Sequence, residues 1–176
     1  AALTLDGSEL KSLRDLGTSL TGLRSLSLAN CRLRDLDGLA AFPELRELNV
    51  AGNPIEDLDP LFHHEALQVL DATDTAVGGS LMSLEVLGTC RLLYRLALRG
   101  TPLAARFPEA DYRRLVCHYL TSLRVLDGKH LAGRLDRVPL DEAELVAAAA
   151  ALEDIETPVA SPPPDAAVAP WQEVLG

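Results

Sequence analysis

Leucine recurs along this chain at a nearly constant interval, and this interval restricts the possible folds more than any other feature of the sequence. The equivalent positions, separated by 23, 22, 22 and 26 residues, are Leu3, Leu26, Leu48, Leu70 and Leu96. A unit of this length cannot bury its own apolar stripe, so consecutive units must stack on one another. The sequence therefore predicts a repeat array rather than a single globular core.

Each of these leucines belongs to the frame L-x-x-L-x-L-x-x-N/C-x-L. The complete copies are Leu23–Leu33, Leu45–Ile55, Leu67–Val77 and Leu93–Leu103, and a partial copy covers Leu3–Leu10. The position that normally carries asparagine holds Ser8, Cys31, Asn53, Thr75 and Thr101 in turn. Serine, threonine and cysteine offer fewer hydrogen-bonding groups than an amide does. We therefore expect weaker bonding between coils than in an array with asparagine in every unit.

Between the frames, apolar residues continue at every third position, as in Leu33–Phe42. A period of three suits short 3₁₀ turns better than it suits an α-helix or a strand. The third unit is four residues longer, and Ser80 followed by Leu81–Cys90 predicts an α-helix in it. Together these features predict an α/β fold: a leucine-rich-repeat solenoid with a concave parallel sheet, a mostly 3₁₀ convex side and a helical C-terminal cap.

The sequence divides into three segments. Residues 1–138 are expected to form the repeat domain, with its C-terminal cap at about 104–131. Residues 139–156 are expected to form an acidic, alanine-rich helix, and residues 157–176 a proline-rich extended tail.

Apolar side chains in the last two segments suggest contacts with other surfaces. Leu145, Ala149, Leu152 and Ile155 form one narrow stripe, which predicts that the helix docks on the cap or on a partner. In the tail, Trp171 and Leu175 are predicted to be a hydrophobic anchor, and the alternative is that the tail is only a linker. An ordered proline-rich tail would indicate a larger complex.

Charge is distributed unevenly. All 16 basic residues fall between Lys11 and Arg137, and residues 1–137 hold 18 of the 26 acidic residues, whereas residues 138–176 hold the other eight acids and no base. This balance argues against binding to nucleic acid or to an anionic membrane. The cysteines, Cys31, Cys90 and Cys117, are far apart in the sequence and suggest a reducing compartment.

Side chains beside the frame leucines should point outward from the concave strands, because strand side chains alternate. The predicted protein-binding residues on this face are Asp6, Glu47, Asn49, Asp71, Asp74, Arg95 and Arg99. Acids dominate the early coils and bases appear in the fourth, which favours a partner of complementary polarity. The alternative is ordinary solvated charge, which any soluble strand face would show.

No arrangement of residues indicates catalysis. The spacing of His63, His118 and His130 does not gather metal ligands, and glycine-rich phosphate-binding loops are missing. His64 occupies the position of Phe42 in the preceding unit, so we interpret it as a packing residue. We therefore expect a protein that is not an enzyme and has no catalytic residues, cofactor or metal.

Two resemblances to known families add to this interpretation. Tyr112–Gly128 resembles the C-terminal cap of 22-residue leucine-rich-repeat families, Y-R-x-x-V followed by L-x-x-L-x-x-L-D-G. Leu13–Leu20, Leu28–Cys31, Leu36–Gly38 and Asp57–Leu61 resemble one ciliary leucine-rich-repeat family, which is associated with outer dynein arm assembly and intraflagellar transport.

The narrower resemblance implies an adaptor or assembly factor for axonemal outer dynein arms in motile cilia. It implies partners among dynein-arm subunits or coiled-coil axonemal and assembly proteins, and a location in the cytoplasm and the cilium or flagellum. The alternative is a leucine-rich-repeat regulatory subunit of a protein phosphatase, because other proteins with 22-residue repeats have that role.

Overall fold

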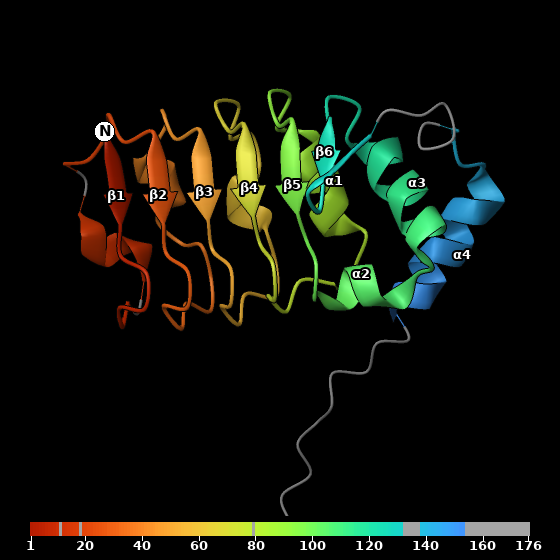
Figure 1. Cartoon of the computed structure of the whole chain (residues 1–176), viewed down its shortest axis with the longest axis horizontal. Helices are drawn as coiled ribbons and strands as arrows, with labels where there is room; N and C mark the ends of the chain where they lie inside the picture. The colour runs from red at the N-terminus through yellow and green to blue at the C-terminus, as the bar shows by residue number, and fades with distance from the viewer. Residues whose placement is uncertain (11, 18, 79, 132–137, 154–176) are drawn as a thin grey trace, which may run out of the picture.

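A single seven-stranded sheet runs the length of the molecule, with its strands in the order of the sequence (Figure 1). The computed structural model describes residues 1–10, 12–17, 19–78, 80–131 and 138–153. The strands are β1 (Ala2–Thr4), β2 (Ser25–Ser27), β3 (Glu47–Asn49), β4 (Val69–Asp71), β5 (Arg95–Ala97), β6 (Val125–Leu126) and β7 (Lys129–His130). The first six are parallel, and β7 turns back antiparallel to β6.

The frame leucines stack in register, as the repeat predicts. Leu3 pairs with Leu26, and the line continues through Leu48, Leu70 and Leu96. Leu126 of β6 extends it into the cap. From Leu26 onward these leucines are at most 2% exposed, so each coil supplies the apolar cover that its neighbour lacks.

The convex side changes character along the solenoid. It begins with three 3₁₀ turns, η1 (Leu13–Leu16), η2 (Leu39–Ala41) and η3 (Asp59–Leu61), as the period of three predicts. The longer third unit forms α1 (Met82–Gly88), and the Ser80 hydroxyl accepts the Met82 N–H at its start. The fold class predicted from the sequence is therefore confirmed.

Two helices and a hairpin close the C-terminal end of the sheet. Thr101 caps α2 (Pro102–Arg106) by accepting the Ala104 N–H, and α3 (Glu109–Tyr119) follows. Asp127 and Gly128, both with positive φ, form the tight turn between β6 and β7. The returning strand covers the sheet edge that β6 would otherwise expose, and the sequence analysis did not anticipate it.

Helix α4 (Glu142–Glu153) lies against the cap at the end of the solenoid (Figure 1). Its buried side chains are Ala148 and Leu152. Of the predicted stripe, Leu152 is buried, Leu145 and Ala149 are half-buried, and Ile155 lies outside the described residues, whereas the stripe did not include the buried Ala148. A reciprocal capping box begins the helix: Asp141 accepts the Glu144 N–H and Glu144 accepts the Asp141 N–H.

Candidate binding surface on the concave face

Two rows of outward side chains cross the concave sheet, one on each side of the stacked leucines. The first row is Ala2, Ser25, Glu47, Val69 and Arg95, and the second is Thr4, Ser27, Asn49, Asp71 and Ala97. Parallel strands lie about 4.8 Å apart, so a partner that crosses the sheet meets one residue of each row in every coil.

The predicted residues divide into strand positions and turn positions. Glu47, Asn49, Asp71 and Arg95 lie in strands and face the concave side. Asp6, Asp74 and Arg99 lie beyond the ends of β1, β4 and β5. The prediction that all of these residues lie on the strands was therefore too broad: the last three line the rim where strands turn toward the convex side.

Asp74 has a conformational role that the sequence analysis missed. The third residue after each of the strands β1 to β5 adopts positive φ. These residues are Gly7, Asn30, Gly52, Asp74 and Gly100. Asparagine and aspartate tolerate this conformation better than other side chains do. The Asp74 carboxylate also covers the next coil, because a Cβ at Gly100 would overlap its Oδ1 atom.

Three more predicted residues are engaged within the chain. Asp6 Oδ1 accepts hydrogen bonds from the Ser27 hydroxyl at 2.6 Å and the Ala29 N–H at 2.8 Å. Asn49 donates to the Ser27 hydroxyl, and Asp71 accepts the Thr73 N–H at 3.0 Å. These hydrogen bonds hold the ends of the strands in place. A partner can still bind the lone pairs and N–H donors of these side chains that the hydrogen bonds leave unused.

Glu47 and Arg95 differ from these residues. Both are exposed, and neither side chain has a hydrogen bond or ion pair with the described part of the chain. They flank Val69, which pairs in register with both of them. The centre of the sheet thus presents an acid and a base about 10 Å apart, two strand spacings, with an aliphatic side chain between them.

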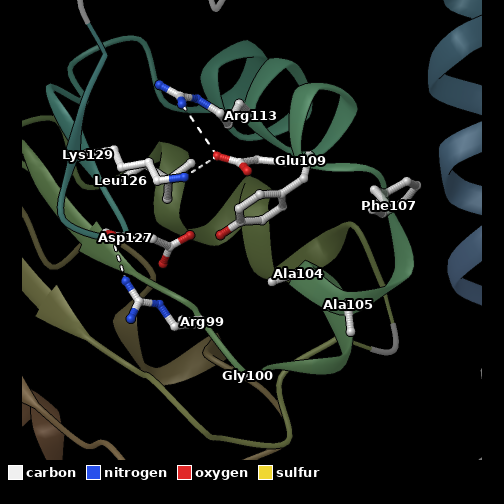
Figure 2. A pocket seen from close by; sticks show the side chains of 11 residues that line it. Arg99, Gly100, Ala104, Ala105, Phe107, Glu109, Arg113, Leu126, Asp127 and Lys129 are labelled. Atoms are coloured by element: carbon white, nitrogen blue, oxygen red, sulfur yellow. Dashed lines mark hydrogen bonds and ion pairs between the residues drawn. The ribbon is translucent and has the colours of Figure 1, made fainter.

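Beyond the end of β5, at the cap end of the solenoid, lies a pocket of about 520 Å³ (Figure 2). It lies between the turn after β5, helices α2 and α3, and the β6–β7 hairpin. Arg99 at its edge donates to the Asp127 carbonyl at 3.0 Å. The Asp127 carboxylate accepts the Leu98 N–H at 2.7 Å, which ties the hairpin to the last coil.

A cluster of charges lines the other side of this pocket. Lys129 and Arg113 both pair with Glu109 (Figure 2), and the hydrogen bond from Lys129 is the main reason that the pKa of Glu109 lies below its ordinary value. With Arg99 and Asp127 included, the lining carries three cations and two carboxylates. The pocket therefore has a small excess of positive charge.

Tyr112 contributes a buried hydroxyl to the pocket lining, close to the Asp127 carboxylate. The side chain is 4% exposed, and its hydroxyl makes no hydrogen bond of good geometry. Burial, reinforced by the nearby Asp127 carboxylate, raises the pKa of Tyr112 above its ordinary value. The neutral phenol has one O–H donor, which faces the Asp127 carboxylate, and its oxygen can also accept a hydrogen bond. The sequence signalled Tyr112 only as part of the cap motif.

Chemically, this surface offers charged, polar and aliphatic groups that a partner can contact. The pocket lining contains neither a histidine nor a serine or cysteine nucleophile. Among the described residues, His, Cys, Asp and Glu side chains nowhere gather in a group of three that could hold a metal.

The described part of the chain has no helix both long and apolar enough to cross a membrane. The predicted anchor at Trp171 and Leu175 lies outside the described residues.

Stacked 22-residue coils with a concave parallel sheet define a leucine-rich-repeat solenoid, a fold that serves as a scaffold for protein interactions. Residues 21–63 match the family described as Leucine Rich repeats (2 copies). Human leucine-rich repeat-containing protein 56 is 42% identical over 134 residues, which cover 71% of this chain and 24% of that protein. The match thus spans about a quarter of that relative's length.

A second relative and a solved structure support the same fold. The U2 small nuclear ribonucleoprotein A' of Mycosarcoma maydis is 34% identical over 127 residues, which cover 71% of this chain and 50% of that protein. The Drosophila melanogaster SNF/U2A' complex contains a chain that aligns with a TM-score of 0.65 at 24% identity, covering 84% of this chain and 78% of the other. At that identity the likeness concerns the fold alone.

Proposed function

We propose that this chain is a non-enzymatic adaptor or assembly factor for axonemal outer dynein arms in motile cilia, and that its concave face holds a helix or loop of a dynein-arm subunit or coiled-coil assembly protein. The single observation behind the binding site is the pair Glu47 and Arg95, exposed and unpaired within the described chain on either side of Val69. Charges held this way on a rigid sheet can select a partner of opposite polarity.

The pocket at the cap end completes the proposed site. A partner element that crosses the sheet from β3 to Arg95 of β5 and continues past the end of this strand toward the cap would approach the pocket, whose lining includes Arg99. The end of this element would place an acid near the excess of positive charge. A second acid, earlier in the partner element, would pair with Arg95, and a base would pair with Glu47.

The ciliary part of the proposal rests on the sequence. The resemblance of Leu13–Leu20 and Asp57–Leu61 to a ciliary leucine-rich-repeat family supports it. The protein would then work in the cytoplasm and the cilium, as part of a larger complex. A phosphatase-regulatory role is the rival proposal, since that role too needs only a protein-binding solenoid.

The test is affinity capture from ciliated cells with a tagged chain and its Arg95→Glu variant. We expect the tagged chain to recover outer dynein arm subunits and Arg95→Glu to reduce recovery about tenfold or more, as loss of a central interface charge can do. Arg91→Glu is the matched control, because Arg91 is exposed but lies before β5 and outside the two rows. Neither substitution should change the melting temperature.

Other outcomes distinguish the proposals. If the chain recovers a phosphatase and never dynein subunits, the phosphatase role replaces the ciliary one. If dynein subunits are recovered equally by Arg95→Glu and Arg91→Glu, the ciliary role survives and the concave site is wrong.

A further inference from the structure

The convex side exposes two large apolar side chains that the solenoid does not need. Phe62 is 56% exposed and Met82 is 54% exposed, whereas the leucines of the neighbouring turns are buried. Phe62 lies outside the period-three pattern: Leu58, Leu61 and His64 are the buried positions of this stretch. The equivalent residue one unit earlier is Ala40. Stacking of the coils therefore does not explain an aromatic side chain at this position.

Phe62 separates two adjoining hollows. One, of about 590 Å³, lies between η3 and α1 and is lined by Phe62, Met82 and Val86 together with polar groups. The other, of about 490 Å³, lies toward η2, and Pro43 and Pro60 contribute to its lining. The two hollows adjoin at Phe62, which lines both of them, and we call the two together the convex groove.

Acidic side chains border the convex groove. Asp59 and Glu85 line the first hollow and Glu65 lines the second, whereas neither lining contains lysine or arginine. All three acids are exposed. An apolar floor with acids at its rim is complementary to a helix that carries an apolar stripe flanked by bases. Methionine, with its flexible and polarisable side chain, suits such a contact.

We propose that the convex groove binds a cationic amphipathic helix of a partner protein. The chain itself is a poor source of this helix, since residues 138–176 contain eight acids and no base. A second copy is also disfavoured, because a two-fold contact would bring Asp59, Glu65 and Glu85 against the same three acids. The proposal concerns the face opposite the sheet and does not depend on the proposed ciliary function.

The test uses a fluorescein-labelled 14-residue peptide of leucine and lysine, arranged to place the leucines on one helical face. We expect saturable binding by fluorescence anisotropy in about 0.15 M salt, where long-range charge effects are screened. Phe62→Ala should weaken binding about tenfold, as truncation of an aromatic anchor does. The matched control is Leu92→Ala, which truncates a side chain that is 55% exposed at another place. It should leave the affinity unchanged.

Further variants separate a specific site from general attraction. Glu85→Lys should weaken binding by a smaller factor than Phe62→Ala, and a peptide of the same composition with alternating leucine and lysine should bind poorly. Equal weakening by Phe62→Ala and Leu92→Ala, or equal binding of the two peptides, would overturn the proposal. Sedimentation that shows a dimer lost in Phe62→Ala would assign the groove to a second copy and overturn it as well. Met82→Gln provides an independent variant should Phe62→Ala lower the melting temperature.

Discussion

The second and third coils and the C-terminal end of this solenoid are held together in different ways. Between those coils, the Asn53 amide lies buried and bridges two units: its Oδ1 accepts the N–H groups of Cys31 and Leu33, and its Nδ2 donates to the carbonyls of Leu28 and Val50. At the equivalent positions nearer the cap, the hydroxyls of Thr75 and Thr101 bond carbonyls of their own coils.

This difference shows that a repeat can replace one means of cohesion with another. The coils that carry threonine are those covered by α1, α2 and α3, and α1 packs against α3. Helices bury more apolar surface between units than a 3₁₀ turn can. Thr75 and Thr101 therefore form the weaker bonding between coils that we expected from threonine. This weaker bonding occurs in the coils whose helices also pack against one another.

The largest effect is expected from Asn53→Thr, which gives this coil the residue of the later ones. Threonine cannot reach both coils, so the N–H groups of Cys31 and Leu33 would remain buried without an acceptor. Each buried unsatisfied group costs about 1–3 kcal/mol, so the free energy of unfolding should fall by about 3 kcal/mol in urea titrations followed by circular dichroism.

Thr75→Val is the reference for that measurement, because it removes a hydroxyl that bonds only within its own coil. It should cost about 1 kcal/mol. Equal losses for Asn53→Thr and Thr75→Val would mean that the amide contributes no cohesion between coils, and the contrast between the two regions would fail.

The sequence predicted the regular half well for a physical reason. A repeated frame specifies the same neighbours in every coil, so the spacing of Leu26, Leu48 and Leu70 was enough to predict their register. His64 was correctly placed in the interior by the same alignment of units. Where structure follows from periodicity, one sequence is sufficient.

Single contacts decided what the sequence could not predict. The left-handed position of Asp74, the returning strand after Asp127 and the placement of the Tyr112 hydroxyl beside Asp127 each depend on one local juxtaposition. In α4, the buried face passes through Ala148 because Arg106 and Arg114 fix its orientation: they donate to the Ala151 carbonyl and the Glu144 carboxylate. The binding roles of Glu47 and Arg95 stay predictions.

A moderate effect is expected from Gly78→Ala, at the junction of the two regions. Gly78 has φ +158°, and a Cβ there would overlap the Leu103 backbone nitrogen and lie 2.8 Å from the Pro102 Cβ. The coil before α1 and the start of α2 would have to move apart, at about 2 kcal/mol in the free energy of unfolding.

Gly22→Ala provides the comparison, because a Cβ at Gly22 would meet nothing within 4 Å and its φ is ordinary. It should leave stability within about 0.5 kcal/mol of the original value. If Gly78→Ala is equally neutral in thermal melts, the close approach of these coils is not a constraint on the junction.

The smallest effect concerns the docking of α4, which depends on pH through Glu144. Two hydrogen bonds from Arg114, at 3.0 and 3.1 Å, are the main reason that the pKa of Glu144 lies below its ordinary value of 4.5. A carboxyl with a lowered pKa in the folded state adds stability above the unfolded pKa, and this stability is lost as pH falls through the folded value. Glu144→Gln should therefore reduce hydrogen-exchange protection of α4 amides at neutral pH, by about two- to fivefold because the pair is partly exposed. The difference between the variant and the original chain should shrink below pH 4.5.

Glu142→Gln is the control, because it removes an exposed charge from the same first turn without touching Arg114. A matching loss of protection in that variant would show that helix charge alone, and not the contact with the cap, keeps α4 in place.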